Sequence, residues 1–386
     1  MRSVPTTSLD LADPAFVADP YPFFAEERRR HPVAWHEPSG MFLTFDHPSV
    51  SAVQRNRDLG RLWHDREPAS LLEPFNLLHR NQMMEHEPPE HTRLRRPVAS
   101  AFSRGHIERL RPRVRELAAE LLGAVDPSSF DAVGDFAEPL PVLVISELLG
   151  VPRSHAPQLR EWSQAIVRMY EPSPSPEVVD AAVTAARDFA ALVRDLADHR
   201  RSQPADDLIS DLVATDLSPD EVVASAVLLL NAGHEASVNV FGNGLVGLLE
   251  RELRPADDVA LTVEEMLRFD AALQLFERTA TAPVTVGDVV VEPGQKVAAL
   301  LGAANRDPAV FPDPDSFDVG REPNPHLAFG VGVHFCLGAP LARMELAESL
   351  AALFATYPDL RLAGEPVSRG TFVLRGNRSV PVSGAG

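Results

Sequence analysis

Apolar side chains recur every three or four positions over most of this chain, which is the period of a helix with one buried face. The pattern dominates Ser103–Leu253 and returns over Pro340–Thr356. The longest expected helix runs from about Pro219 to Leu253. The other expected helices are Ser103–Leu122, Val142–Leu149, Pro157–Met169, Pro176–Arg201, Asp206–Ala214, Leu261–Phe269 and Pro340–Thr356.

Strand patterns are short and fall in two regions, Pro32–Thr44 and Val284–Leu300. Within the second region, Gly287 and Asp288 interrupt a run of valines, which predicts a hairpin turn. Because no linker, repeat or low-complexity tract divides the chain, we expect one domain over residues 1–386: a helix-rich α+β fold with small sheets. The expected strands are Pro32–His36, Met41–Thr44, Val284–Val291 and Lys296–Leu300.

Composition narrows the class of protein. The net charge of −19 argues against nucleic acid as a partner. The longest apolar run, Val222–Leu230, is too short to cross a bilayer, so we expect no membrane association. The 386 residues hold one cysteine, Cys336, which cannot form an internal disulfide and suits the reducing cytoplasm.

Cys336 lies among glycines, just ahead of a helix expected to begin near Pro340. Unpaired N–H groups and the dipole at a helix N-terminus stabilise a thiolate, which is a metal ligand or a nucleophile. A buried, inert cysteine is the plainer alternative. His334 is poorly placed to act as a base for a nucleophile, and structural zinc needs several ligands, whereas haem iron needs one thiolate from the protein.

Around this cysteine lies the run Phe329-Gly330-x-Gly332-x-His334-x-Cys336-x-Gly338-x-x-Leu341-Ala342-Arg343. This run resembles the haem-binding loop of bacterial cytochromes P-450. The resemblance implies the P-450 fold, with a long central helix over the haem, and haem b (iron protoporphyrin IX) as cofactor. It also implies that Cys336 is the axial ligand of the iron, with Phe329 and Gly330 in the cofactor-binding loop.

Further motifs follow in the order usual for that family, over nearly the whole chain. Glu265 and Arg268 resemble its Glu-x-x-Arg motif and lie one helical turn apart. The resemblance adds Arg321 as the third member of a buried, structural ion cluster. The other matching stretches are Asp19-Pro20-Tyr21-Pro22, Asn305-Arg306-Asp307-Pro308 and Phe317-Asp318.

Four residues are implied to hold the two haem propionates. His91 and Arg95 lie four residues apart on one helical face, so both can reach one anion. In the family such a pair acts together with an Arg beyond the Glu-x-x-Arg helix and with the His of the cysteine loop. Those positions are Arg278 and His334 here. Taken singly, each of the four is equally typical of a protein surface.

The long helix resembles the family's oxygen-binding stretch, Ala-Gly-x-Asp/Glu-Thr. Ala232 and Gly233 match the small residues that leave room for O2 against an opened helix, and Glu235 matches the acid that supplies protons. The usual threonine, whose hydroxyl orders water, is replaced by Ala236. Ser237 carries a hydroxyl one residue later, about 100° around the helix, where we do not expect it to substitute.

The resemblance also indicates a substrate pocket. Asn231 and Gln274 are polar where the family often has apolar residues, which favours either a polar substrate group or a hydrogen bond within the protein. Two departures from the family affect this region. Leu249–Thr262 is shorter than usual, and Ala271–Gln274 stands where Pro-Val is common. The implied pocket residues are Leu228, Asn231, Leu273, Gln274 and Phe372.

By resemblance the chain is an oxidoreductase that inserts one atom of O2 into a small organic substrate, as in secondary metabolism. Since no flavin or iron–sulfur domain is present, we expect electrons from a separate ferredoxin and its reductase. Arg93–Arg115 holds eight arginines and one acid, Glu108, and could bind such an acidic partner. The alternatives are oxidative coupling without oxygen insertion, and a haem-binding sensor without turnover.

Overall fold

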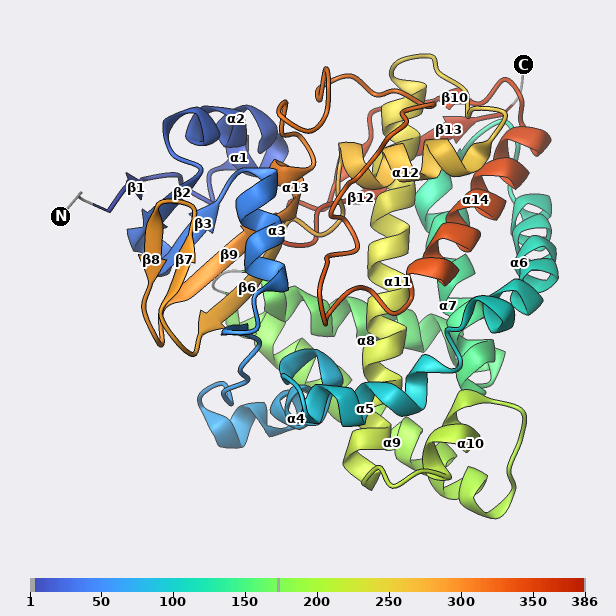
Figure 1. Ribbon diagram of the computed structural model, residues 1–386. Coiled ribbons are helices and arrows are strands. Elements are labelled where there is room, and N and C mark those ends of the chain that lie inside the picture. The colour runs from blue at the N-terminus through green and yellow to red at the C-terminus, as the bar shows by residue number, and fades with distance from the viewer. Residues whose placement is uncertain (1–3, 172–173, 385–386) are drawn as a thin grey trace. The chain divides into compact units, whose positions relative to one another are not determined.

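The computed structural model describes residues 4–171 and 174–384, which divide into two compact units (Figure 1). Unit 1 comprises the described residues up to Arg61, together with Asn239–Ala339 and Arg361–Pro381. Unit 2 comprises Leu62–Val238, Pro340–Leu360 and the described residues from Val382. Within the described ranges, no helix has the length and apolar character needed to span a membrane.

Unit 1 is built around a six-stranded sheet of order β1-β2-β3-β9-β6-β4. Its helices are α1 (Pro14–Ala18), α2 (Tyr21–Arg30), η1 (Glu37–Ser39), α3 (His47–Arg55), α12 (Val259–Phe269) and α13 (Leu301–Ala304). Its strands are β1 (Thr6–Thr7), β2 (Val33–His36), β3 (Met41–Thr44), β4 (Leu59–Gly60), β6 (Leu275–Ala280), β7 (Val284–Val286), β8 (Val289–Val291), β9 (Lys296–Leu300), β10 (Arg361–Leu362), β11 (Val367–Ser368) and β12 (Asn377–Ser379).

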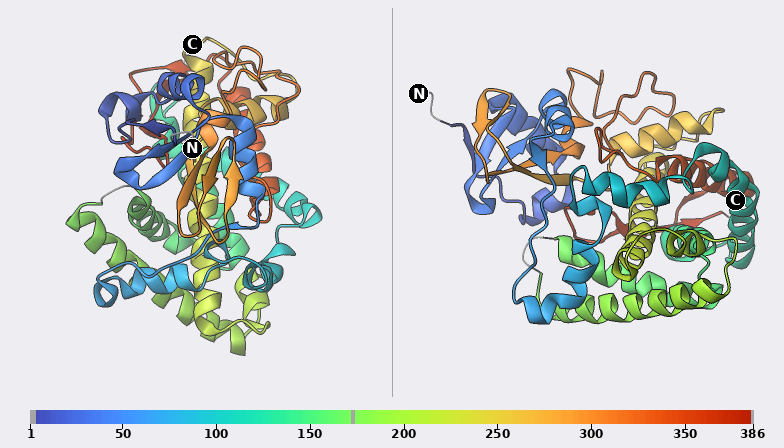
Figure 2. Two further views of the ribbon diagram at one scale, coloured as in Figure 1. Left: turned by 60° about the vertical axis from the view of Figure 1, so that its left-hand side comes forward. Right: turned by 60° about the horizontal axis from the view of Figure 1, so that its bottom comes forward.

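Side chains along the strands of this sheet point alternately to its two faces, and each face carries its own hydrophobic cluster. On β9, Val297 and Ala299 belong to a cluster with α3 and the β7–β8 hairpin, whereas Ala298 and Leu300 belong to a second cluster. Successive side chains of a strand point to opposite faces, so the two clusters pack on the two faces of one sheet. The second cluster contains Phe16 of α1 and residues of α2. Figure 2 (left) brings this part of unit 1 forward.

The turn between β7 and β8 confirms the hairpin expected from Gly287 and Asp288. Val286 pairs with Val289, and Gly287 has a φ of +57°. Of the two turn residues only Gly287 has a positive φ, which is the type II′ pattern that matches the twist of the flanking strands.

Unit 2 is almost entirely helical. Helix α9 packs against α4 and α8, and Figure 2 (right) brings these helices forward. The unit contains α4 (Ala69–Arg80), η2 (Met83–Glu85), α5 (Glu90–Ala99), α6 (Arg104–Ala124), β5 (Phe130–Asp131), the π-helix η3 (Ala132–Ala137), α7 (Pro139–Leu149), η4 (Arg153–His155), α8 (Ala156–Val167), η5 (Arg168–Tyr170), α9 (Pro176–Ser202), α10 (Leu208–Val213), most of α11 (Pro219–Leu249) and all but the first residue of α14 (Ala339–Thr356). Strand β13 (Pro381–Ser383) includes the last residue of unit 1.

Helix α11, the long yellow helix of Figure 1, begins with a capping box. The Ser218 hydroxyl accepts from the Glu221 N–H at 3.3 Å, and the Glu221 carboxylate accepts from the Ser218 N–H at 2.8 Å. This reciprocal pair satisfies two backbone donors that the helix leaves unpaired. From Val222 to Leu230 every residue is buried, so the apolar run predicted to be part of a helix is a buried helix segment.

The predicted elements match the observed ones closely where the pattern is long. The observed α6, α9 and α14 lie within two residues of the predicted bounds, and β3 and β9 match theirs. Helix α11 ends at Leu249, four residues before the predicted end at Leu253. The structure adds β6 over Leu275–Ala280, which pairs with β9, and several short helices before residue 100.

Candidate active site

The thiol of Cys336 lies on a loop of unit 1 whose shape is set by one backbone hydrogen bond and two glycines. The Cys336 N–H donates to the Phe329 carbonyl at 2.9 Å. Gly330 and Gly332 have φ values of +66° and +83°, a region that other residues rarely adopt. A Cβ on Gly332 would come within 2.5 Å of the Gln54 carbonyl oxygen of α3, so the close packing of the loop also requires glycine there.

The donor set at this loop fits haem. Cys336 is partly exposed and lies three residues before the start of α14, and a helix N-terminus favours a thiolate. Residues 4–171 and 174–384 contain no group of three His, Cys, Asp or Glu side chains that could hold a metal ion. A single thiolate suits a haem iron, because the porphyrin supplies the in-plane ligands, and does not suit structural zinc.

The middle of α11 carries a window of small residues on an otherwise buried helix. Between Val222 and Val240, only Ala232, Gly233 and Ala236 are not buried. Ala232 and Ala236 lie four residues apart and therefore share a face. A Cβ on Gly233 would make only ordinary contacts, 3.9 Å from Ile145, so packing within unit 2 does not require glycine. The window leaves room for a group other than the protein's own side chains.

The helix itself is unbroken through this window, which corrects the expectation of an opened helix at Ala232 and Gly233. Ser237 is buried, with 6% of its surface exposed, while Ala236 beside it is partly exposed. The hydroxyl of Ser237 is thus turned away from the window by the helical step of about 100°.

Glu235 is almost fully buried next to the window, beside a histidine that we did not predict. The His234 Nδ1 lies 3.3 Å from the Glu235 carboxylate and 3.5 Å from the Ser163 hydroxyl of α8. His234 has no exposed surface. The predicted proton-supplying acid therefore lies in a small polar cluster inside unit 2, which the sequence motif alone does not reveal.

Of the four residues predicted to bind the haem propionates, two belong to each unit. His91 is buried on α5, and Arg95, one turn later, is half-buried; both belong to unit 2. Arg278 is buried on β6, and His334 is partly exposed on the cysteine loop; both belong to unit 1. A buried guanidinium and a buried imidazole suit an anionic ligand, and the convergence of all four on the propionates stays a prediction.

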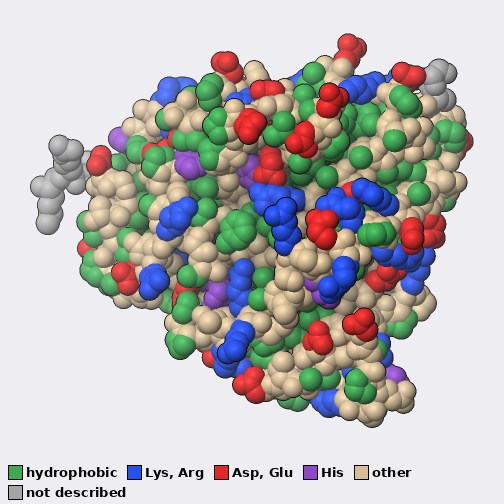
Figure 3. All heavy atoms as spheres, turned by 45° about the vertical axis from the view of Figure 1, so that its right-hand side comes forward, with side chains coloured by type: hydrophobic (Ala, Val, Ile, Leu, Met, Phe, Trp, Pro, Cys, Tyr) green, Lys and Arg blue, Asp and Glu red, His purple; other side chains and the backbone are tan. Residues whose placement is uncertain are grey.

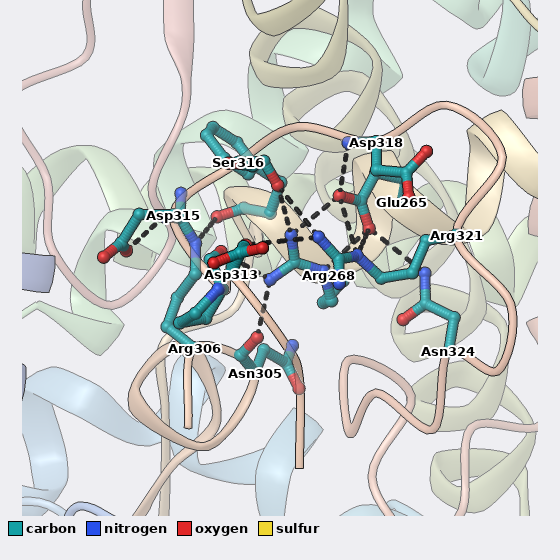
Figure 4. Close-up of polar contacts among 12 residues, drawn as sticks. Glu265, Arg268, Asn305, Arg306, Asp313, Asp315, Ser316, Asp318, Arg321 and Asn324 are labelled. Atoms are coloured by element: carbon teal, nitrogen blue, oxygen red, sulfur yellow. Dashed lines mark hydrogen bonds and ion pairs between the residues drawn. The ribbon is translucent and has the colours of Figure 1, made fainter. Parts of the chain in front are cut away.

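The structure brings the predicted ion cluster together inside unit 1 (Figure 4). The Arg268 guanidinium donates twice to the Glu265 carboxylate, at 2.7 Å each, and Arg321 Nε donates to it at 3.1 and 3.2 Å. The Asp318 N–H and Asn324 Nδ2 also donate to this carboxylate. Burial lowers the pKa of Arg268, and its bonds to Glu265 oppose that effect. Arg268 further donates to the carbonyls of Asn305, Pro314 and Ser316.

The predicted pocket residues separate into two groups. Leu228 and Asn231 of α11 line a small hollow inside unit 2. Leu273, Gln274 and Phe372 lie in unit 1. Leu273 is partly buried and packs against the first core cluster of the sheet. Of the predicted pocket residues, the two on α11 line the hollow.

Gln274 and Phe372 are packed inside unit 1, and their assignment to the pocket stays a prediction. The fully buried Gln274 amide donates to the Tyr21 hydroxyl at 3.1 Å and to the Ala271 carbonyl at 2.7 Å. Phe372 is 2% exposed and packs on Phe16, with ring centroids 4.8 Å apart. The structure shows hydrogen bonds within the protein for Gln274 Nε2, while the buried Oε1 has no hydrogen-bond partner among the described residues.

Four of the eight arginines of Arg93–Arg115 pair with carboxylates of unit 2. Arg111 and Arg115 both donate to Glu348 of α14, and Arg113 donates to Glu147 at 2.7 Å. On the face that Figure 3 draws, basic and acidic side chains lie next to one another. This corrects the picture of a docking surface made from the whole cluster, because paired arginines attract an acidic partner less. The remaining pairs in the cluster are Arg93 with Glu90 and Glu221, Arg111 with Glu108, and Arg113 with Glu116.

Comparisons with known proteins agree with this site. The family model described as Cytochrome P450 matches residues 259–358, which include the Glu265 motif and the cysteine loop. The chain is 37% identical to 6-deoxyerythronolide B hydroxylase of Saccharopolyspora erythraea, over 98% of this chain and 99% of that protein.

Solved structures agree over the same length. P450BioI, in complex with an acyl carrier protein carrying hexadec-9Z-enoic acid, has a TM-score of 0.92 and 31% identity, over 96% of this chain and 99% of its own. The P450 enzyme CxnD, for C–S bond formation in chuangxinmycin biosynthesis, has a TM-score of 0.85 and 27% identity, over 95% of this chain and 94% of its own. The extent of these matches, together with the thiolate loop, shows that the chain belongs to the cytochrome P450 family.

Proposed function

We propose that this haem-containing oxidoreductase is a monooxygenase that hydroxylates or epoxidises a small, mainly apolar organic molecule. The bound haem b supplies the redox chemistry of O2. For a C–H substrate the balance is RH + O2 + 2e⁻ + 2H⁺ → ROH + H2O, so each turnover consumes two electrons and two protons. The observation that carries the proposal is the window of Ala232, Gly233 and Ala236 on α11, which leaves space on a buried helix.

The residues of the two units have separate tasks in this proposal. Cys336 would hold the haem iron through its thiolate, on a loop whose backbone conformation depends on Gly330 and Gly332. His91, Arg95, Arg278 and His334 bind the propionates through charge-assisted hydrogen bonds. Ala232 and Gly233 keep the window open for O2.

Proton delivery is the step at which this chain departs from its family. Glu235, next to the window, is the acid that we assign to supply protons. Ala236 has no hydroxyl to order water there, and the buried Ser237 does not replace it. We therefore assign the ordering of water at the window to Glu235 and to a polar group of the substrate.

Natural-product intermediates are the substrate class that the relatives favour. The 6-deoxyerythronolide B hydroxylase is named for its oxidation of such a compound, and it covers nearly the whole chain. Electrons come from a separate ferredoxin and its reductase in this proposal. Of the arginines considered for docking, Arg104 lies at the start of α6, and Arg109 contacts only His106 among the described polar side chains.

Oxidative coupling is the second candidate, favoured by Ala236. An enzyme that joins two substrate atoms does not need the hydroxyl that usually assists oxygen insertion. CxnD, which is named for C–S bond formation, shows that a similar chain can perform such a reaction. The third alternative, a sensor without turnover, has no comparable support, because Glu235 is retained beside the window.

Turnover under ¹⁸O2 with a ferredoxin system distinguishes these functions. 6-Deoxyerythronolide B, for which the similar hydroxylase is named, would serve as the first substrate. Monooxygenation puts ¹⁸O into the product, coupling gives a joined product without ¹⁸O, and a sensor gives no product. The monooxygenase proposal fails if the product lacks ¹⁸O.

Ala236→Thr tests the source of the missing hydroxyl. If the substrate supplies it, threonine crowds the window and lowers turnover, and analogues that lack the hydroxyl react poorly with the wild type. Improved coupling of electron use to product, with undiminished turnover, would show instead that the enzyme lacks only a proton relay. The ratio of product formed to NADPH consumed by the reductase measures the difference.

A further inference from the structure

The small hollow inside unit 2 combines an apolar wall with four polar side chains, those of His79, Gln82, Tyr170 and Asn231. Leu78 of α4, Ile166 of α8 and Val227 of α11 contribute aliphatic surface. Asn231, one helical turn after Val227, contributes an amide. Gln82 and Tyr170 contribute a second amide and a phenol. Because α4, α8 and α11 all belong to unit 2, the geometry of the hollow is that of one compact unit.

The carbonyl oxygen of Asn231 is the group that lacks a protein partner. The residue is only 6% exposed, and no residue within the described ranges donates a hydrogen bond to its Oδ1. A buried acceptor without a donor is costly, because it has lost its bonds to water. An unpartnered oxygen at the wall of a hollow therefore favours a ligand that donates to it.

The neighbouring phenol favours a donor as well. His79 Nδ1 lies 2.9 Å from the Phe75 carbonyl, which can only accept, so Nδ1 carries the proton of the ring. In the neutral ring Nε2 is then an acceptor, and the Tyr170 hydroxyl, 3.1 Å away, donates to it. The proton of the Tyr170 hydroxyl is thus directed at His79, so Tyr170 does not donate to a ligand in the hollow.

Stacking between aromatic rings fixes the orientation of the His79 imidazole. Its ring stacks on Phe75, with centroids 4.0 Å apart, and on Trp63, at 4.9 Å. It is 2% exposed, so water does not compete for its two hydrogen bonds. The hydrogen-bonding pattern of the hollow is thus set by packing within unit 2, before any ligand binds.

We infer that the hollow binds the hydroxyl group of an otherwise apolar substrate, which donates its proton to the Oδ1 atom of Asn231. A carbonyl or ether oxygen cannot donate a hydrogen bond, so it would leave the Oδ1 atom of Asn231 without a partner. An ammonium group would lack a counter-charge, since none of the residues lining the hollow is a carboxylate. This inference rests on the proposed function, in which the substrate carries a polar group, and it specifies that group and its contact.

Binding of cyclododecanol and cyclododecanone to the holoenzyme tests the inference by isothermal titration calorimetry. The two probes have nearly the same size, and only the alcohol can donate. We expect the wild type to bind the alcohol roughly five- to tenfold more tightly, as for one hydrogen bond to a buried acceptor. In Asn231→Leu the two probes should bind with equal affinity. Asn231→Ala, which leaves more space, should also lose the preference.

Asn239→Leu is the matched control. Asn239 is on the same helix, is fully buried and has no hydrogen-bond partner for its amide within the described ranges, but it does not line the hollow. The alcohol preference should survive in this variant. Equal affinities in the wild type, no detectable binding of the alcohol, or a preference that persists in both Asn231 variants would overturn the inference.

The ferrous carbon monoxide spectrum of the same preparations separates this result from the proposed function. A thiolate-type spectrum with no alcohol preference would defeat the hydroxyl assignment alone. Loss of the thiolate-type spectrum in the wild type would defeat the proposed function, whatever the calorimetry shows.

Discussion

Glu265→Gln should destabilise the protein strongly, because one carboxylate compensates two buried guanidinium groups. The side chains of Glu265 and Arg268 have no exposed surface, and that of Arg321 is 8% exposed. Glutamine keeps the volume and one acceptor oxygen, so the change removes charge without creating a cavity. Removing one partner of a buried ion pair costs about 3–5 kcal/mol, and the loss here affects two arginines. We therefore expect the free energy of unfolding of Glu265→Gln to fall by an amount near the upper end of that range.

Urea unfolding of the holoenzyme, followed by far-ultraviolet circular dichroism and by haem absorbance, measures this loss. Glu250→Gln is the control, since its side chain is 51% exposed and lies 3.7 Å from the exposed Arg251. Exposed pairs contribute about 0–1 kcal/mol, so this variant should be close to the wild type. A loss below about 1 kcal/mol in Glu265→Gln would refute the reasoning that the cluster depends on this charge.

A double variant tests the same reasoning from the other side. In Glu265→Gln/Arg268→Met one of the uncompensated charges is gone. The loss in free energy of unfolding should therefore be smaller than the sum of the losses in Glu265→Gln and Arg268→Met. A coupling of about 0.5–3 kcal/mol is typical of residues in one network. Strict additivity would show that the two side chains act independently, against the geometry of Figure 4.

Three further predictions concern the site and its surroundings. Burial raises the pKa of Glu345 to about 8, so between pH ~4.5 and ~8 the unfolded chain loses this proton while the folded protein keeps it. Stability should fall over that window by up to about 1.4 kcal/mol per pH unit, and the fall should be smaller in Glu345→Gln, as measured by unfolding at several pH values. His91→Ala and Arg278→Ala should each weaken haem retention by about 1.5–3 kcal/mol in a haem-transfer assay, and unchanged retention in both would place the propionates elsewhere. Arg104→Glu/Arg109→Glu should slow reduction by an acidic ferredoxin at low salt, and a rate insensitive to both substitutions and salt would exclude these arginines from docking.

Local sequence patterns predicted the features of this protein that depend on near neighbours. The long helical periods gave α6, α9 and α14 to within two residues, and Gly287 gave the hairpin, because these signals are contained in one segment. The pair of Glu265 and Arg268 follows from their spacing on one helix. The cysteine loop was recognised because many residues match at fixed spacing.

Features that depend on distant partners could not be predicted in this way. The arginines of α6 look free in the sequence, but Glu348, which neutralises Arg111 and Arg115, lies more than 230 residues away. The hydrogen bond from the Gln274 amide to the Tyr21 hydroxyl joins residues 253 positions apart, so no local pattern predicts it. The strand β6 has no clear alternation, because most of its residues are half-buried, and pairing with β9 determines its conformation.

The absorption spectrum of the ferrous carbon monoxide complex is the most direct test of the account's central claim, that Cys336 is the thiolate ligand of the haem. The wild type should show the band that marks thiolate ligation. Cys336→His should lose that band even where haem is retained, because an imidazole replaces the thiolate. A thiolate-type band that survives in Cys336→Ala would contradict the assignment, since the chain has no second cysteine to provide the ligand.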